Sequence, residues 1–221
     1  MAAIIDVSGI PGAYARVNLP RCGRRQAQVI LASDSKTFQE GDSVTLSLEG
    51  DVVLTGSVLR VGVERSLPKL WLQDAAGLSK VLPAKFYRGG TEELVARDIL
   101  SEAGLSGEVK LPTPTPWYNR MAGTGCNQLA DLLEAGNLWR SRANGTVYVG
   151  PETWAKGVSL EWGETLTAVD ALGNAFSAVL TVAAEPGTVA TLDPNGEEGQ
   201  FKIQRVQHLV DGKRVETTLW I

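Results

Sequence analysis

The sequence has few of the residues that build catalytic and metal sites. Its 221 residues include one histidine, His208, and two cysteines, Cys22 and Cys126. A single histidine gives a Ser-His-Asp or Cys-His arrangement only one possible centre, and no His or Cys neighbours it at metal-ligand spacing. Two cysteines far apart in the sequence do not indicate a disulfide scaffold, and they favour a reduced, cytosolic origin. We therefore expect no catalytic or metal site at His208, and no cofactor.

Excess positive charge and long apolar segments are also missing. The chain has 21 Lys and Arg against 25 Asp and Glu, a net charge of −4. This balance argues against wrapping duplex nucleic acid, which usually requires an excess of basic residues. No apolar run approaches the roughly 18 residues that span a bilayer, and the N-terminal segment MAAIIDVSGIPG lacks the basic start of a secretion signal. We expect neither membrane insertion nor secretion by this route.

The first third of the chain has the pattern of β-structure. The segment DSVTLSLEG alternates apolar and hydroxyl-bearing residues, which is typical of a half-buried strand. Gly50-Asp51 is predicted to be a two-residue turn into a long strand, in which Gly56 indicates a bend or bulge. Strands are predicted at 27–33, 42–50, 52–65 and 69–76. Short turns between antiparallel neighbours favour a small barrel or sandwich.

The period changes from two to that of a helix at residue 91. Thr91 is a suitable N-cap for a helix that ends near Gly104. A proline-rich connector, PTPTP (112–116), follows. A second helix is predicted over 126–136, with an apolar stripe that ends at Gly136, and a hairpin that turns at Asn144-Gly145 comes next.

The last third is again β-rich, with strands predicted at 175–185 and 188–192 before a closing hairpin. Pro186-Gly187 and the segment DPNGEEG separate these strands. The fold class is therefore mainly β with an α+β insert. We expect a barrel domain at 1–90, a middle domain with two helices and a hairpin at 91–163, and a β region at 164–221. Two arrangements are open: region 164–221 completes one barrel together with region 1–90, or it forms part of a second barrel.

The closing hairpin contains the lone histidine. If Asp211-Gly212 is a two-residue type I′ turn, His208 lies opposite Val215 on a mainly apolar face. This register predicts that His208 packs inside the protein rather than acting in catalysis or metal binding. Each arm has about nine residues, longer than an average strand, so the hairpin should join a sheet of its own domain or of a neighbouring subunit.

Three further features could form sites, and each has a plainer interpretation. Glycines in AGTGCNQL (122–129) could hold a phosphate, but a glycine-rich helix entry is favoured because the Lys and Ser/Thr of a P-loop are absent. Glu161 and Glu164 beside Trp162 could be a glycosidase pair, but a solvated turn is the safer interpretation. Arginines 21, 24 and 25 in RCGRR could bind an acidic partner or phosphate, or form a solvated loop that precedes the first predicted strand as an arm.

The six tryptophans are scattered at strand and loop ends. They do not form the cluster that a stacking platform for nucleic acid requires. Core and subunit contacts are favoured because aromatic side chains dominate both. The candidate contacts with subunits or partners are Arg21, Arg24, Arg25, His208 and Trp220.

Taken in order, these segments resemble the baseplate hub proteins of phage tails, including late-control D-like and gp27-like hubs. The resemblance rests on the strands in VILASDSKTFQEGDSVTLSLEGDVVLTGSVLRV and on the segment LWLQDAAGLSKVL. It continues in YRGGTEELVARDILSEAGL, in LADLLEAGNLWRSRANGTVYVG and in the closing GQFKIQRVQHLVDGKRVETTLWI. The chain is much shorter than the larger hubs, which leaves open whether it contains one tube-like barrel or two.

The resemblance implies a structural protein of the virion tail baseplate, assembled in the host cytoplasm. It also implies a homotrimeric ring. This ring would join the tail tube, or a distal tail protein, to a central spike or tip and to other baseplate proteins. By the same resemblance, DNA would pass through the ring without specific binding. The resemblance assigns no catalytic residue to this chain. The alternative function is a carbohydrate-binding or glycan-degrading tail module that uses exposed tryptophans with Glu161 or Glu164.

Overall fold

The computed structural model describes residues 4–34, 37–111, 113–170, 172–193 and 199–221. The chain forms two compact units. Unit 1 comprises Met1–Arg21, Arg25–Asp74 and Thr153–Ile221, and unit 2 comprises Cys22–Arg24 and Ala75–Glu152. The expected boundaries at 90 and 163 therefore differ from those of the structure, which groups residues 75–90 with the helices and residues 153–163 with the C-terminal strands.

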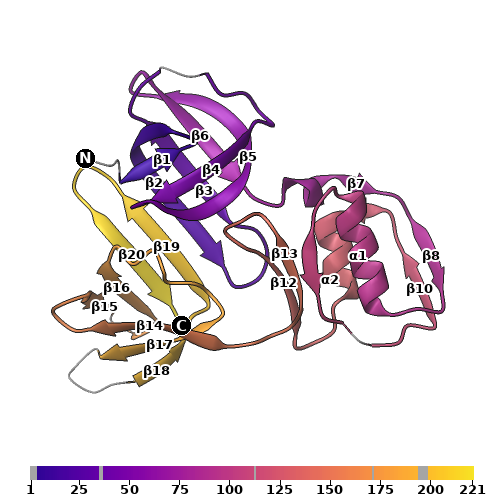
Figure 1. Ribbon diagram of the computed structural model, residues 1–221. Coiled ribbons are helices and arrows are strands. Elements are labelled where there is room, and N and C mark those ends of the chain that lie inside the picture. Colours follow the sequence, from indigo (N-terminus) through magenta and orange to yellow (C-terminus); the bar gives the residue numbers. More distant parts are fainter. Residues whose placement is uncertain (1–3, 35–36, 112, 171, 194–198) are drawn as a thin grey trace. The chain divides into compact units, whose positions relative to one another are not determined.

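Six strands of unit 1 close into an antiparallel barrel, drawn in indigo and purple in Figure 1. They are β1 (Ile5–Val7), β2 (Ile10–Pro20), β3 (Gln26–Leu31), β4 (Ser43–Leu48), β5 (Asp51–Glu64) and β6 (Leu67–Gln73). Their order around the barrel is β1-β4-β5-β6-β3-β2, and the pairing of β1 with β2 completes the circle. The prediction of a small antiparallel barrel is thus confirmed, and closure joins the first and last of its six strands.

The alternating pattern of β4 determines which side chains enter the barrel. Val44, Leu46 and Leu48 are at most 3% exposed, as the period of two predicts. The turn into β5 is formed by Glu49 and Gly50, both at positive φ, rather than by Gly50-Asp51. The predicted turn was one residue late, because Asp51 already pairs with Leu48 as part of the ladder.

The prediction of a bulge at Gly56 was wrong. Gly56 pairs regularly with Val44, and the irregularities of β5 lie between its partners Leu46 and Ser47 and between Val58 and Arg60. A Cβ atom at Gly56 would lie 2.3 Å from the backbone oxygen of Gln73. Glycine is therefore needed there for the close approach of two backbones.

Strand β2 connects the barrel to the C-terminal strands. Near its start it pairs with β1 through Pro11 and Ile10, and from Ala15 to Pro20 it pairs with β19 (Arg205–Val210). The sheet then continues through β20 (Val215–Trp220) and β16 (Ala175–Val179) to β15 (Leu166–Val169). The C-terminal region thus does not complete the barrel, because β1 already closes it; it extends the sheet from β2.

A second, three-stranded sheet completes unit 1. It consists of β14 (Ala155–Glu161), β17 (Thr188–Asp193) and β18 (Gly199–Lys202). The strand expected at 175–185 ends at Val179, and residues 194–198 of DPNGEEG lie outside the described residues. Phe176 and Phe201 place their ring centroids 5.1 Å apart between the two C-terminal sheets, and the buried residues of barrel and C-terminal strands form one hydrophobic cluster.

The closing hairpin forms as predicted but in a different register. Val210 pairs with Val215, so His208 lies opposite Thr217 rather than Val215. The turn spans four residues because the Asp211 carboxylate accepts hydrogen bonds from the backbone N–H groups of residues 213 and 214, each at 2.7 Å. A shift of two residues keeps every side chain on its predicted face, and His208 is accordingly fully buried.

Unit 2 contains both helices and several short strands, drawn in magenta to orange in Figure 1. Its elements are η1 (Ala76–Ser79), β7 (Val81–Leu82), β8 (Lys85–Arg88), α1 (Glu92–Glu102), β9 (Gly107–Val109), β10 (Trp117–Arg120), β11 (Gly123–Thr124), α2 (Gly125–Leu132), β12 (Asn137–Ser141) and β13 (Val147–Pro151).

The predicted ends of α1 are confirmed. The Thr91 hydroxyl accepts a hydrogen bond from the backbone N–H of Leu94, and Gly104 follows the helix at φ 72°. Helix α2 ends at Leu132, four residues before the expected Gly136. No helix in the described ranges is long and apolar enough to cross a membrane.

Candidate interaction surface

Arg25, one of the three arginines expected to contact a partner, is buried in unit 1. Its residue is 5% exposed, and its two terminal nitrogens donate to the Glu185 carboxylate at 3.0 and 2.7 Å. The same guanidinium donates to the backbone oxygen of Val53, and the Arg25 N–H donates to Asp74. This bidentate geometry anchors the end of β3 to the loop after β16, and it leaves the side chain no surface for a partner.

The remaining arginines of RCGRR belong to the folded units. Arg21 is half-buried, 5.6 Å from the Trp154 ring centroid, and Arg24 donates through Nε to Cys126 Sγ at 3.1 Å within unit 2. Gly23 exchanges backbone hydrogen bonds with β12, donating to Trp139 at 2.8 Å. The segment is not an arm before the first strand, because β2 precedes it and its own backbone joins a sheet.

His208 and Trp220, the other expected contacts, lie on opposite faces of the closing hairpin. His208 Nδ1 is 2.9 Å from the Thr217 hydroxyl, which also accepts the N–H of Thr181 at 2.8 Å. Burial, together with the Arg25 charge, lowers the pKa of His208 to about 4, so the imidazole is neutral at pH 7. Trp220 is half-buried beneath Arg205, whose Cζ is 3.7 Å from the ring centroid.

The possible glycosidase pair and the glycine-rich segment both have plain structural roles. Glu161, Trp162 and Glu164 are exposed in the turn between β14 and β15, where Thr165 hydrogen bonds to the Glu161 backbone. Gly125 of the glycine-rich segment is buried, and a Cβ there would lie 2.8 Å from Leu78 Cδ2, which explains the glycine by close packing. Within the described ranges, no three His, Cys, Asp or Glu residues are grouped to hold a metal ion.

The feature that sequence reasoning missed is a two-stranded ribbon in unit 2, formed by β8 and β10. The strands are antiparallel, with Trp117 opposite Arg88 and Arg120 opposite Lys85. Alternation places the side chains of residues 86, 88, 117 and 119 on one face and those of residues 85, 87, 118 and 120 on the other. The two faces differ sharply in their environment.

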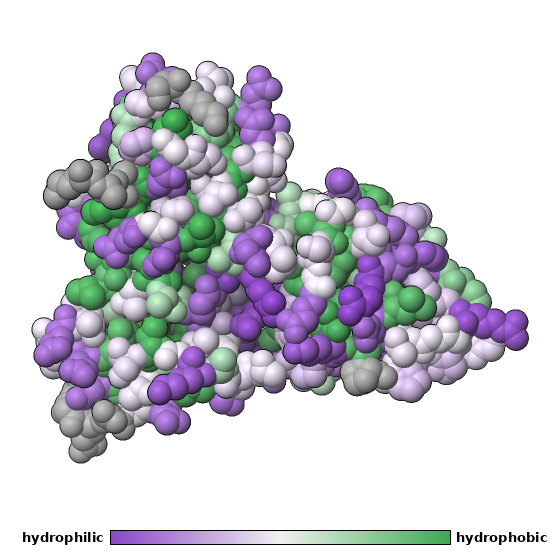
Figure 2. Space-filling model, in the orientation of Figure 1, coloured by the Kyte–Doolittle hydropathy of each residue, from purple (hydrophilic) through white to green (hydrophobic). Residues whose placement is uncertain are grey.

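The outer face of the ribbon is aromatic and exposed. We call the side chains of Phe86, Arg88, Trp117 and Asn119 the ribbon surface. Phe86 and Trp117 are 60% and 61% exposed, with their ring centroids 5.9 Å apart. The Arg88 guanidinium lies 5.2 Å from the Trp117 ring centroid. Figure 2 shows apolar and hydrophilic side chains side by side over this end of unit 2. Exposed aromatic pairs with an arginine are typical of protein contacts.

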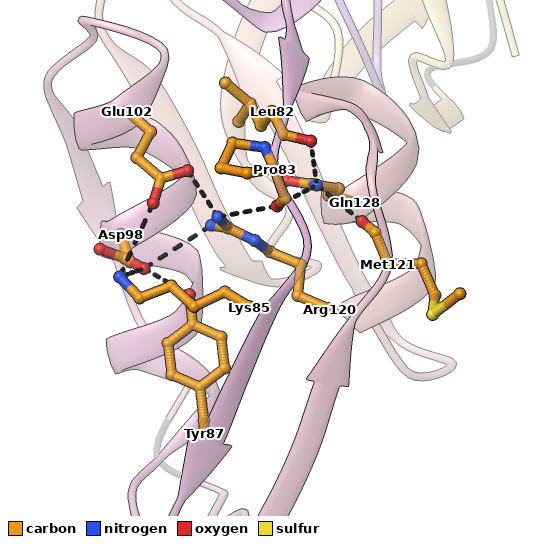
Figure 3. Close-up of polar contacts among 9 residues, drawn as sticks. All are labelled: Leu82, Pro83, Lys85, Tyr87, Asp98, Glu102, Arg120, Met121 and Gln128. Carbon is orange, nitrogen blue, oxygen red and sulfur yellow. Dashed lines mark hydrogen bonds and ion pairs between the residues drawn. The ribbon is translucent and has the colours of Figure 1, made fainter.

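The inner face of the ribbon is clamped to α1 by a network of charges (Figure 3). Lys85 Nζ and Arg120 Nη2 lie 2.5 Å from Asp98 and Glu102 of α1, respectively. The side chain of Arg120 is fully buried. Tyr87 donates its hydroxyl hydrogen bond to the same Asp98 carboxylate. We call these five residues the clamp; it fixes the ribbon on the helix and thereby holds the ribbon surface in place.

The clamp also connects to α2. The Arg120 guanidinium donates to the backbone oxygen of Pro83 at 3.2 Å. The buried Gln128 amide donates to the backbone oxygen of Met121 at 2.8 Å, just after β10. Lys85 and Arg120 share one end of the ribbon, and this end is thus attached to both helices through buried polar groups, which are costly to separate once desolvated.

The charges of the clamp are strongly coupled. Burial would raise the Asp98 pKa, but the hydrogen bonds from Lys85 and Tyr87 outweigh it, and the pKa lies below its usual value. The hydrogen bond to Asp98 raises the pKa of Lys85, while burial first and the same carboxylate second raise that of Tyr87. Each group is therefore held in its ordinary protonation state at neutral pH.

A sequence signal for the ribbon existed in KFYR and WYNR. Each segment contains two aromatic residues or two cations within four positions, and neither contains a carboxylate. The proline-rich stretch before Trp117 favoured a connector instead, and four-residue strands are too short for a periodic pattern to stand out. Their partners lie 29 to 35 positions apart in the sequence, and such a pairing could not be inferred without knowing the register.

The fold, a small closed antiparallel barrel in one unit and an α+β arrangement in the other, is one that solved phage tail proteins also have. No family model matches the chain, and no curated protein matches it by sequence. Among solved structures, a 43 kDa tail protein of prophage MuSo2 from Shewanella oneidensis superposes with a TM-score of 0.78 at 12% identity, covering 97% of this chain and 95% of that one.

Two further structures agree. A tail protein of Neisseria meningitidis MC58 gives a TM-score of 0.71 at 12% identity over 98% of this chain and 95% of its own. A component of the type VI secretion system of E. coli, described as similar to the T4 tail proteins gp27 and gp5, gives 0.74 at 11% identity over 97% and 75%. The resemblance to phage tail hubs is thus confirmed at the level of the fold.

Proposed function

We propose that the chain is a structural hub of a phage tail baseplate, which forms a homotrimeric ring between the tail tube and the central spike. The observation that carries this proposal is the fold, a closed barrel extended by C-terminal strands, shared over 95% or more of the chain with several tail proteins. Tail proteins act by assembly, so the surfaces of the chain rather than a catalytic pocket would carry the function.

An apolar stripe on β5 supports assembly. This strand has 14 residues, and Leu59, Val61 and Val63 in its C-terminal half are 55%, 36% and 77% exposed. Val61 and Val63 share one face of the strand, and Leu59 is the extra residue at the irregularity between Val58 and Arg60. A group of three exposed aliphatic side chains is unusual on a surface that stays in water. A ring in which a neighbouring subunit covers the stripe would remove this apolar area from water.

The overall charge supports a conduit for DNA. A net charge of −4 gives phosphates no general attraction to the protein, and a channel that attracted them would slow the passage of DNA. We expect acidic residues to outnumber basic residues along the lumen of the ring. A lumen lined mainly with lysine and arginine in a structure of the assembled ring would contradict this part of the proposal.

The oligomeric state tests the proposal directly. The full chain is analysed by light scattering and native mass spectrometry, alone and with tail tube and spike proteins, and a trimer is expected. Val63→Lys on the stripe should weaken the trimer, whereas Leu172→Lys at an isolated residue that is 82% exposed should not. A chain that stays monomeric even with both partners present would refute the hub function.

A glycan-binding or glycan-degrading module is not favoured by a specific observation. The most exposed tryptophans, Trp117 and Trp162, belong to different units, and Trp162 stands with Glu161 and Glu164 in a turn. Four other tryptophans are buried or lie beneath cationic side chains, namely Trp71, Trp139, Trp154 and Trp220.

A further inference from the structure

We propose that the ribbon surface of one copy of the chain docks on the acidic end of the barrel of a second copy. The inference rests on the proposed ring and adds a specific contact to it. We call this second site the barrel-end surface and define it by Ile4, Glu49, Asp51 and Val52.

The ribbon surface carries a cation with no carboxylate beside it in the described part of the chain. The eight residues of β8 and β10 include three cations and no acid. The clamp neutralises Lys85 and Arg120, but among the described residues no carboxylate pairs with Arg88. A guanidinium held over an indole ring is preorganised for a bidentate contact with a carboxylate. The surface therefore fits a partner that presents carboxylates among apolar side chains.

The barrel-end surface has this complementary chemistry. Glu49 lies in the exposed turn between β4 and β5, Asp51 follows that turn, and the Glu49 N–H donates to the backbone oxygen of Ile4. Ile4 and Val52 are 45% and 44% exposed. No Lys or Arg occurs in residues 37–59, which contain four acidic residues. Two carboxylates and two aliphatic side chains thus lie around one turn.

The charge of the two units points in the same direction. Unit 1 contains 12 Lys and Arg against 17 Asp and Glu, whereas unit 2 contains nine against eight. Contact between unit 2 of one copy and unit 1 of the next is therefore favoured electrostatically over contact between two copies of unit 1. Such a contact joins two different surfaces, and a heterologous contact of this kind closes into a ring when the rotation that relates neighbouring copies is a whole fraction of a turn.

The ribbon contact is too small to hold two copies together alone. Two aromatic side chains bury roughly 300 to 500 Å² in total, whereas a stable interface buries at least about 1,000 Å². We therefore expect the ribbon to strengthen a ring that also uses the β5 stripe. Within such a contact a central tryptophan is the usual hot spot, and its removal weakens association about 30-fold.

Glycan binding is less consistent with this surface. Stacking of a sugar requires an open ring face, but Arg88 covers one face of Trp117. The Phe86 and Trp117 rings are inclined by 35° and do not form a flat platform.

Analytical ultracentrifugation of the purified full chain tests the contact. Trp117→Ala should weaken self-association about 30-fold, and the matched control Trp162→Ala, at a tryptophan that is 49% exposed in unit 1, should leave it unchanged. Arg88→Glu should weaken it about 10-fold, with an effect that shrinks at high salt. Circular dichroism of each variant verifies that the fold is retained.

A charge exchange identifies the partner surface. The pair Glu49→Lys and Asp51→Lys should weaken association about as much as Arg88→Glu, and combining all three substitutions should restore it to within about threefold of the wild type. Restoration requires that the two surfaces meet, because neither change alone creates an attractive pair.

The outcomes separate this inference from the hub function. A ring of unchanged stability in Trp117→Ala and Arg88→Glu, or no restoration in the charge exchange, overturns the ribbon contact and leaves the hub standing. A wild-type chain that stays monomeric at its highest soluble concentration also overturns it, whether or not tube and spike proteins assemble a ring. Binding of a bacterial polysaccharide that is lost in Trp117→Ala, with self-association unchanged, assigns the surface to glycans instead.

Discussion

The single histidine makes the stability of the protein depend on pH in a way that can be isolated. His208 is completely buried, its Nδ1 contacts Thr217, and no hydrogen-bond partner is found for its Nε2 among the described residues. Burial, with the nearby Arg25 charge, lowers its pKa from 6.5 to about 4. The unfolded chain therefore binds a proton at a pH where the folded chain does not, and acid favours unfolding.

The size of the effect follows from this difference in pKa. The contribution of His208 to the free energy of unfolding is fully present above pH 6.5 and is lost as the pH falls toward 4. A shift of this size corresponds to about 3 kcal/mol in total, at about 1.4 kcal/mol for each pKa unit. Between pH 7.5 and pH 5 the loss from this one group is about 2 kcal/mol. Carboxylates that titrate below pH 5 add their own contributions at the acid end of this range.

Urea unfolding of the wild type and of His208→Gln at both pH values isolates the histidine. Glutamine retains a polar group near Thr217 but does not titrate, and contributions from carboxylates cancel in the comparison. The wild type should lose about 2 kcal/mol more than the variant between pH 7.5 and pH 5. NMR titration of the only imidazole gives the folded pKa directly. A midpoint near 6 or above, or equal losses in the two proteins, would refute the argument.

Three other substitutions test the packing. Glu185→Gln leaves a buried arginine without its carboxylate and should lower the free energy of unfolding by about 2 kcal/mol in urea titrations. Glu102→Gln weakens the clamp around the fully buried Arg120 and should accelerate hydrogen exchange of the ribbon amides while those of the barrel keep their rates. Gly56→Ala places a Cβ against a neighbouring backbone and should cost at least about 2 kcal/mol, whereas Gly212→Ala, with no atom within 4 Å, should be nearly neutral in the same thermal melts.

Much of the fold could be predicted because its signals are local. Alternation in β4 determined which residues enter the barrel, and the Thr91 cap determined where α1 begins. The closing hairpin shows the limit of such reasoning. Its strands and faces followed from the period of two, but its register depended on the Asp211 side chain, which closes a four-residue turn by hydrogen bonds that a type I′ pattern does not include.

Strands, helices and the apolar face that carries His208 follow from the order of residues alone, because each depends on neighbours along the chain. Three features emerge only in the folded chain: β2 joins the barrel to the C-terminal strands, Arg25 lies inside with Glu185 160 positions away, and the ribbon is clamped to α1. These features depend on contacts between distant segments. The charge of an arginine is the same in a solvated loop and in a buried ion pair, so its role is fixed only when the fold supplies or withholds a partner.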